Sequence, residues 1–150
     1  MKYGRKVALA RTMARYLVPL KEEWSADTVL MPIPLHRWRL WGRGFNQSGL
    51  VAQELGRRWG LAVDSGSLAR VKRTRPLKGL NHIQRRKAVA GAFKVLRPDV
   101  IRGRTVVLID DVLTSGSTAE ACARILRRAG AGWVELLSWA RVVRPSQLMR

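Results

Sequence analysis

Cysteine and long hydrophobic segments are what this sequence of 150 residues has least of. Its one cysteine, Cys122, excludes a disulfide framework and a cysteine-based zinc site within the chain. The longest apolar run in the second half, Val106–Ile109, is far shorter than the roughly 18 residues that a membrane span needs. The first residues carry dispersed basic charge and have no apolar core of a secretory signal. The sequence therefore predicts a cytoplasmic protein with no membrane span.

Acidic residues are also scarce. The sequence has ten Asp and Glu and 29 Lys and Arg, which gives a formal net charge of +19. Such an excess predicts attraction to polyanions, namely nucleic acid, a polyphosphate metabolite or an acidic surface. The alternative is a solvated surface from a genome that prefers arginine, because 22 of the 29 cations are Arg. Apolar residues make up 47% of the chain, which is enough for the core of one ordinary domain.

What is present is an alternation of strand and helix patterns. The clearest strand is Thr105–Ile109, which is β-branched and apolar on both faces, as in a parallel sheet covered on both sides. The alternation predicts an α/β fold with a mainly parallel sheet, in which ligands bind beyond the carboxyl ends of the strands. We expect helices at about 5–20, 46–59, 81–89 and 117–129, and strands at 28–33, 67–71, 92–96, 105–109 and 133–140.

Residues 106–118 carry the strongest functional signal. The predicted strand ends in Asp110 and Asp111, a loop of small hydroxyl residues follows, and a helix begins directly after it. Backbone N–H groups at a helix start bind phosphate, and carboxylates accept hydrogen bonds from sugar hydroxyls. The pattern therefore indicates a sugar-phosphate site, with a plain Asp-rich turn and a Ser/Thr N-cap as the alternative. It lacks the spacing and the lysine of a P-loop, and it is not a dinucleotide fingerprint.

The stretch VVLIDDVLTSGST resembles the phosphoribosyl-pyrophosphate (PRPP) motif of type I phosphoribosyltransferases. Residues 32–37 (PIPLHR) and 43–47 (RGFNQ) narrow the resemblance to the ComF family, the competence protein F-like phosphoribosyltransferases, over about residues 1–140. The resemblance implies the type I phosphoribosyltransferase fold, a central and mainly parallel β-sheet flanked by helices. We expect a single domain over 1–150, with a flexible basic lid at about 70–87.

The lid segment contains eight cations and no acid, and Pro76 and Gly79 interrupt it. A solvated loop, a lid and a nucleic-acid-binding patch all fit this composition, and its place relative to the strands favours a lid. Asn81 is expected to cap the short helix that follows.

The resemblance also implies residue roles. Asp110 and Asp111 would position the ribose of PRPP, and Mg²⁺ would accompany the pyrophosphate, with no metal ligand assigned in the chain. The 5′-phosphate loop would be Leu113, Thr114, Ser115, Gly116, Ser117 and Thr118; the pyrophosphate loop would be Leu35, His36 and Arg37; and Arg73, Arg75 or Lys78 would neutralise the departing charge.

The function implied is Mg²⁺-dependent PRPP binding with phosphoribosyl transfer, a pentosyl glycosyltransferase reaction, to an unknown acceptor in a protein linked to DNA uptake and natural competence. Two alternatives remain: a non-catalytic nucleic-acid-binding competence protein, and a regulator that senses PRPP. Expected partners are PRPP, single-stranded DNA, competence or DNA-processing proteins, and a second copy of the chain in a homodimer.

The sequence departs from its relatives at several points. Thr114 stands where purine-salvage relatives carry an aspartate, which argues against hypoxanthine or guanine as the acceptor. Ala88 and Lys78 replace an Asn and a Gln that are usual in the ComF family. The family's four-cysteine zinc module would end where this sequence begins, so a truncated, a miscalled and a shortened start are all open.

Four other residues have two interpretations each. Trp38 and Trp41 lie among arginines and could stack on bases, although packing against a partner surface is favoured. We expect a solvated His82 and a buried Cys122.

Overall fold

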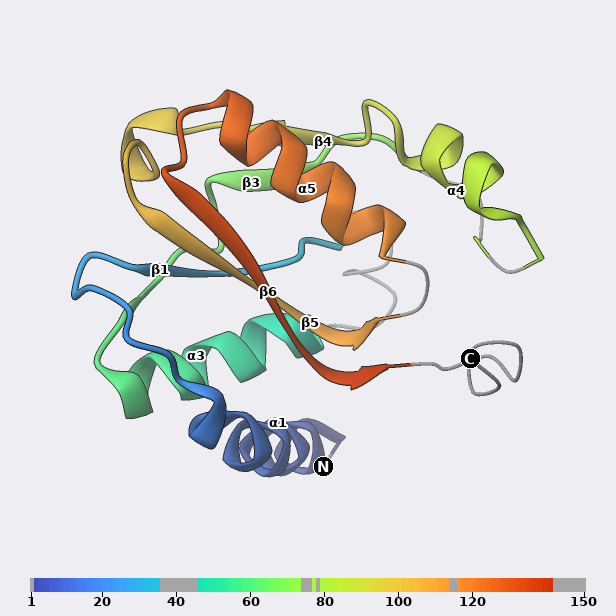
Figure 1. The fold of residues 1–150 in the computed structure, drawn as a ribbon. Coiled ribbons are helices and arrows are strands. Elements are labelled where there is room, and N and C mark those ends of the chain that lie inside the picture. Colours follow the sequence, from blue (N-terminus) through green and yellow to red (C-terminus); the bar gives the residue numbers. More distant parts are fainter. Residues whose placement is uncertain (1, 36–45, 74–76, 78, 114–115, 142–150) are drawn as a thin grey trace, which may run out of the picture.

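The computed structural model describes residues 2–35, 46–73, 77, 79–113 and 116–141. Helices and strands alternate as the sequence pattern predicts (Figure 1). The helices are α1 (Lys2–Leu17), α3 (Gln47–Trp59), α4 (His82–Val89) and α5 (Ser117–Arg128), with 3-10 turns η1 (Val18–Leu20) and η2 (Pro98–Val100). The strands are β1 (Val29–Pro32), β2 (Ala62–Val63), β3 (Leu68–Arg70), β4 (Phe93–Val95), β5 (Thr105–Leu113) and β6 (Trp133–Arg141).

The central sheet has four parallel strands in the order β2-β1-β5-β6. Val29 pairs with Val106 and Thr105 pairs with Trp133, so the first residues of β1, β5 and β6 start near one edge and all three strands run to the opposite edge. The α/β class and the parallel central sheet are therefore confirmed. The two-residue strand β2 was not predicted, because Ala62 and Val63 are too short a run to show any periodicity.

Side chains of β5 alternate between two hydrophobic layers. Val107 and Ile109 pack on the side of α1 and α3, whereas Val106 and Leu108 pack on the side of α5. Figure 1 shows the same arrangement, with α1 and α3 on one face of the sheet and α5 on the other. The near-continuous apolar run of β5 follows from burial on both faces.

A second, two-stranded antiparallel sheet lies on the α5 side. Leu68 pairs with Val95 and Arg70 pairs with Phe93. The sequence pattern indicated both strands but not that they pair with each other outside the central sheet. Leu68 and Phe93 join the α5 core layer, so this small sheet packs over α5 as an added layer.

In the part of the chain that the structure describes, strand β6 is an edge of the central sheet. Trp133 and Trp139 on this strand are both exposed, Trp133 by 54%. Among the described helices, none combines the length and the apolar character that crossing a membrane requires.

Candidate functional site

The carboxyl ends of β1 and β5 meet at one edge of the sheet. Past the end of β1, the backbone N–H of Ile33 donates to the carbonyl of Ile109 at 2.9 Å, which continues the ladder by one bond. The side-chain amide of Asn46 then donates to the carbonyl of Ile33 at 3.2 Å. These bonds hold the chain that leads into half-buried Leu35 beside the end of β5.

The acidic pair lies within β5 and not in the turn after it. The strand was expected to end at Ile109, but pairing with β6 continues through Asp110 opposite Ser138 to Leu113 opposite Arg141. The sequence pattern predicts the end of the strand at the first acid, because Asp has a low strand propensity. In the structure, pairing with β6 extends the strand beyond that residue. The register is constant along the pair, so the pleat directs Asp110 to the α5 face and Asp111 to the opposite face. Both residues are half-buried, and Asp110 is the one that faces the start of α5.

The pKa of the Cys122 thiol depends on charged groups near this edge. Cys122 is fully buried in the α5 core layer, as expected. Burial raises the pKa of the Cys122 thiol to about 12, while the Arg70 guanidinium lowers this pKa and the Asp110 carboxylate raises it. Arg70 and Asp110 therefore both act on one buried point, which places a cation of β3 and an acid of β5 on the same side of the sheet.

Helix α5 begins at Gly116, which adopts φ 77° and ψ 0°. This left-handed conformation favours glycine, and the residue has no side chain with which to cap the helix. Ser117 is buried and Thr118 half-buried in the first turn. The helix start therefore presents its backbone N–H groups at the carboxyl edge of the sheet, which is the arrangement that binds a phosphate.

The predicted site residues divide by position. Asp110, Asp111, Gly116, Ser117, Thr118 and Leu35 lie at the carboxyl edge, and the backbone of Leu113 ends β5 there. Arg73 is exposed beyond β3. His36, Arg37, Thr114, Ser115, Arg75 and Lys78, together with Trp38 and Trp41, lie outside the described residues.

Three further residues, which the sequence pattern did not assign to the site, stand out in the structure. Asn46 anchors the exit of β1, and its place before a predicted helix was a usable signal. Arg70, whose guanidinium lies 5.3 Å from the centroid of the Phe93 ring, gave no signal beyond its charge. Arg85 is buried on α4, and only its spacing of four residues from Val89 hinted at this. The expected lid segment contains the end of β3 and most of α4, and its flexibility stays a prediction.

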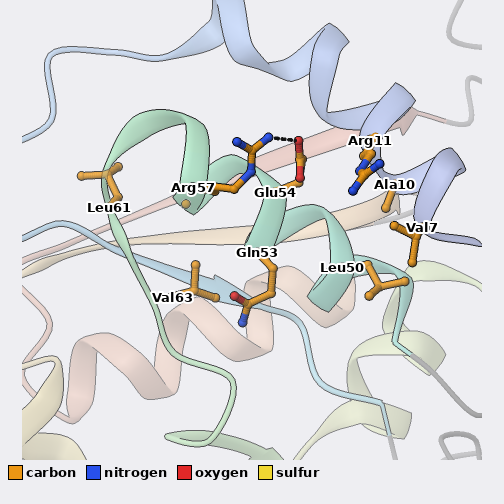
Figure 2. Close-up of a pocket in the computed structure, with 10 residues that line it drawn as sticks. Val7, Ala10, Arg11, Leu50, Gln53, Glu54, Arg57, Leu61 and Val63 are labelled. Atoms are coloured by element: carbon orange, nitrogen blue, oxygen red, sulfur yellow. Dashed lines mark hydrogen bonds and ion pairs between the residues drawn. The ribbon is translucent and has the colours of Figure 1, made fainter.

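A cavity of about 600 Å³ lies elsewhere, between α1, α3 and β2 (Figure 2). Its polar lining includes Arg11, Gln53 and an ion pair between Glu54 and Arg57 at 2.7 Å. The hydrogen bond from Arg57 lowers the pKa of Glu54 against the effect of desolvation, and Arg58 lowers it further. None of the predicted site residues lines this cavity. A second cavity of about 260 Å³ lies between α5 and β6 and includes Gly116 in its lining.

The carboxylates at the edge fit the chemistry of Mg²⁺. This ion prefers oxygen ligands and is usually held by one or two carboxylates together with phosphates and water. Asp110 and Asp111 supply oxygen donors of that kind at the carboxyl end of β5. Among the described residues, no group of three or more His, Cys, Asp or Glu could hold a metal ion.

Comparison with known proteins gives a consistent result. The profile of the phosphoribosyl transferase domain family matches residues 43–142. Competence protein F of Haemophilus influenzae is 30% identical over 147 residues, which cover 93% of this chain and 64% of that protein. DNA utilization protein YhgH of Salmonella typhimurium is 34% identical over 149 residues, which cover 95% of this chain and 65% of that protein. The chain thus spans just under two thirds of the length of these relatives.

Solved structures resemble the fold at low sequence identity. Adenine phosphoribosyltransferase from Thermoanaerobacter pseudethanolicus aligns with a TM-score of 0.56 at 14% identity, covering 89% of this chain and 80% of that one. The glutamine PRPP amidotransferase from B. subtilis, complexed with ADP and GMP, aligns with a TM-score of 0.56 at 19% identity, covering 87% of this chain and 26% of that one. Both likenesses concern the arrangement of strands and helices.

Proposed function

The chain belongs to the phosphoribosyl transferase domain family, and we propose that it binds PRPP with Mg²⁺ and transfers the phosphoribosyl group to an acceptor. The observation that carries the proposal is the junction of β5 with α5. There, Asp110 faces a helix that starts at a glycine without a capping side chain. A carboxylate for sugar hydroxyls and backbone N–H groups for a phosphate thus come from one continuous segment of the chain.

Each part of PRPP has a matching group at this edge. Backbone N–H groups of the first turn of α5 would donate to the 5′-phosphate. Asp110 would accept a hydrogen bond from a ribose hydroxyl, and Asp111 would help to position the ribose from the opposite face of β5. The segment that starts at Leu35, which Ile33 and Asn46 hold beside the end of β5, would receive the pyrophosphate together with Arg73, Arg75 or Lys78.

In the proposed reaction, the acceptor's electron pair forms a bond to ribose C1 while the bond from C1 to the pyrophosphate oxygen breaks. Pyrophosphate leaves with that electron pair, and the acceptor loses a proton to solvent or to a nearby base. Mg²⁺ bound with the pyrophosphate would offset part of the leaving group's charge. The cations of the basic segment would offset more of that charge and would help to exclude water from C1.

The direct test is calorimetric titration of PRPP with Mg²⁺ at near-physiological ionic strength, where exposed charges are screened. The Asp110→Asn/Asp111→Asn variant should lose saturable binding and remain folded. The matched control is Asp27→Asn/Asp99→Asn, which makes the same change in charge at exposed residues before β1 and β5, near the amino edge of the sheet. Equal binding in wild type and the 110/111 variant would contradict the proposal.

An assay for released pyrophosphate separates an enzyme from a sensor of PRPP. We expect release only when a suitable acceptor is present, so a panel of nucleobases and amines is offered in turn. PRPP binding without turnover across the panel would favour the regulator.

A second candidate function, nucleic-acid binding linked to DNA uptake, is favoured by the distribution of charge. Six exposed cations lie along the segment that runs from the end of β3 through α4 to just beyond β4: Lys72, Arg73, Arg86, Lys87, Lys94 and Arg97. Relatives are named competence protein F and DNA utilization protein. Binding of a single-stranded oligonucleotide would weaken steeply between low and physiological salt, because phosphate contacts release counterions. PRPP binding at a half-buried site should depend much less on salt.

A further inference from the structure

Arg85 is the buried charge that the fold does not explain. It is 8% exposed, while its neighbours Arg86 and Lys87 on α4 are exposed. Its Nε atom is buried and has no hydrogen-bond partner among the described residues, where no ion pair of Arg85 is found either. Burying a polar nitrogen without a hydrogen-bond partner destabilises a protein, so packing alone gives no reason for an arginine here.

The position of Arg85 follows from the contacts of α4 with α5. Arg85 precedes Val89 by four residues and shares its face of the helix. Val89 packs in the same core layer as Ala119, and Arg86 lies 3.5 Å from the Glu120 carboxylate in the first turn of α5. Figure 1 shows α4 beside the beginning of α5, with the two helices running in the same direction. One turn before Val89, Arg85 therefore lies toward the start of α5 at Gly116.

The charges around this point favour an anion. The start of α5 carries the positive end of the helix dipole, and a guanidinium fork binds phosphate oxygens strongly. Glu120, the one acidic side chain of that turn, is balanced by Arg86 and by Arg124, which lies 2.9 Å away. A phosphate at the start of α5 would thus meet a buried cation and an already paired Glu120, while Asp110 faces the same point from β5.

We infer that Arg85 is a binding residue for this phosphate, and that it completes the subsite formed by the backbone at the start of α5. The inference rests on the proposed function in identifying the anion as the 5′-phosphate of PRPP. It predicts an arginine that lowers the stability of the empty protein and raises its affinity for a phosphate monoester.

The test compares wild type with Arg85→Met and with Lys87→Met, which removes an exposed cation from the same helix that takes no part in balancing Glu120. Calorimetry measures affinity for ribose 5-phosphate, for pyrophosphate with Mg²⁺ and for PRPP with Mg²⁺. We expect Arg85→Met to weaken ribose 5-phosphate and PRPP by roughly tenfold or more, the size of one lost charge-assisted hydrogen bond. Pyrophosphate affinity should change by less than about twofold, as should all affinities of Lys87→Met, since an exposed, screened cation contributes little. The melting temperature of Arg85→Met should equal or exceed that of wild type.

The outcomes separate this inference from the proposed function. If wild type binds PRPP and Arg85→Met binds ribose 5-phosphate equally well, the inference fails alone. An equal loss in Arg85→Met and Lys87→Met would assign the effect to bulk charge and would also overturn it. If wild type binds ribose 5-phosphate through Arg85 but does not bind PRPP, the proposed function fails, and Arg85 stands as a binding residue for a phosphate monoester that does not belong to PRPP. Absence of binding to all three ligands overturns both. If Arg85→Met does not fold, Arg85→Lys, which keeps the charge but lacks the fork, decides by the same ribose 5-phosphate comparison.

Discussion

Helices α3, α4 and α5 start in two different ways. At α3, the Asn46 side chain accepts from the N–H of Ser48 at 3.1 Å, and at α4 Asn81 and Gln84 form a reciprocal capping box at 2.8 and 3.0 Å. At α5 the N-cap is Gly116, which has no side chain to offer. A side-chain cap satisfies backbone N–H groups within the chain, whereas a glycine start leaves them accessible to a ligand. The chain itself thus caps the starts of α3 and α4, whereas the start of α5 is suited to bind a substrate.

The largest expected effect comes from placing a charged side chain at the uncapped start of α5. Gly116→Asp places a carboxylate where the proposed phosphate would bind. Two like charges about 4 Å apart at a protein surface repel by about 4 kcal/mol. PRPP affinity measured by calorimetry should therefore fall by at least roughly a hundredfold.

The matched control is Gly103→Asp. Gly103 has a similar φ of 72°, and a Cβ added there would meet nothing within 4 Å. Both variants should lose about 1–2 kcal/mol of unfolding free energy from the left-handed backbone, but only the change at 116 should reduce binding. Equal loss of binding in both would show that the effect is one of general stability.

The opposite change, removal of a side-chain cap, should affect stability first. Asn46→Ala loses the cap on α3 and also the 3.2 Å bond to the carbonyl of Ile33. We expect the unfolding free energy in urea to fall by about 1–2 kcal/mol. Asn46→Asp keeps the capping oxygen and loses the amide donor, so its loss should be intermediate. A loss in the Asp variant as large as in the Ala variant would assign the whole effect to the bond that anchors β1.

The turn after β2 also has its polar groups hydrogen-bonded within the chain, and its contribution to stability should depend on pH. Asp64 accepts from the N–H groups of Gly66 and Ser67, each at 2.8 Å, and from the Ser67 hydroxyl at 2.5 Å. Burial opposes ionisation, but these hydrogen bonds and the nearby Arg97 lower the pKa of Asp64 below its ordinary value.

Because the folded pKa of Asp64 is the lower one, its stabilisation is present above the unfolded pKa and is lost as the pH falls through the folded one. Asp64→Asn should cost about 1 kcal/mol at neutral pH. Melting temperatures of the variant should fall less than those of wild type between neutral and acidic pH. Parallel curves for the two proteins would contradict the assignment.

The smallest effect is expected at α4. Asn81→Ala removes a capping box on an exposed eight-residue helix, so about 0.5–1 kcal/mol should be lost in urea unfolding. PRPP affinity should stay within about twofold of wild type, because a helix cap outside the site adds no contact to the ligand. A large fall in affinity would show that α4 must be fully formed for the site to bind, which would make α4 more than a support for Arg85.

Local patterns predicted the elements but not their partners. Asn46 and Asn81 indicated where helices start, and the β-branched run from Thr105 indicated the central strand, because capping and alternation involve neighbours in the chain. The end of β5 was wrong by four residues, because pairing with β6 and not local propensity extends the strand past Asp110. The pairing of Leu68 with Val95 joins residues 27 positions apart and has no local signature.

Local sequence patterns were sufficient to predict the α/β class, the family and the segment that joins the acids to the helix start, because each depends on residues close together in the chain. Contacts between distant segments were needed to show that Asp110 and Asp111 face opposite sides of the sheet and that Arg85 is buried on α4, which packs beside α5. The register with β6 and the packing of α4 come from contacts between distant segments, and the sequence pattern of one segment does not encode which other segment will cover it.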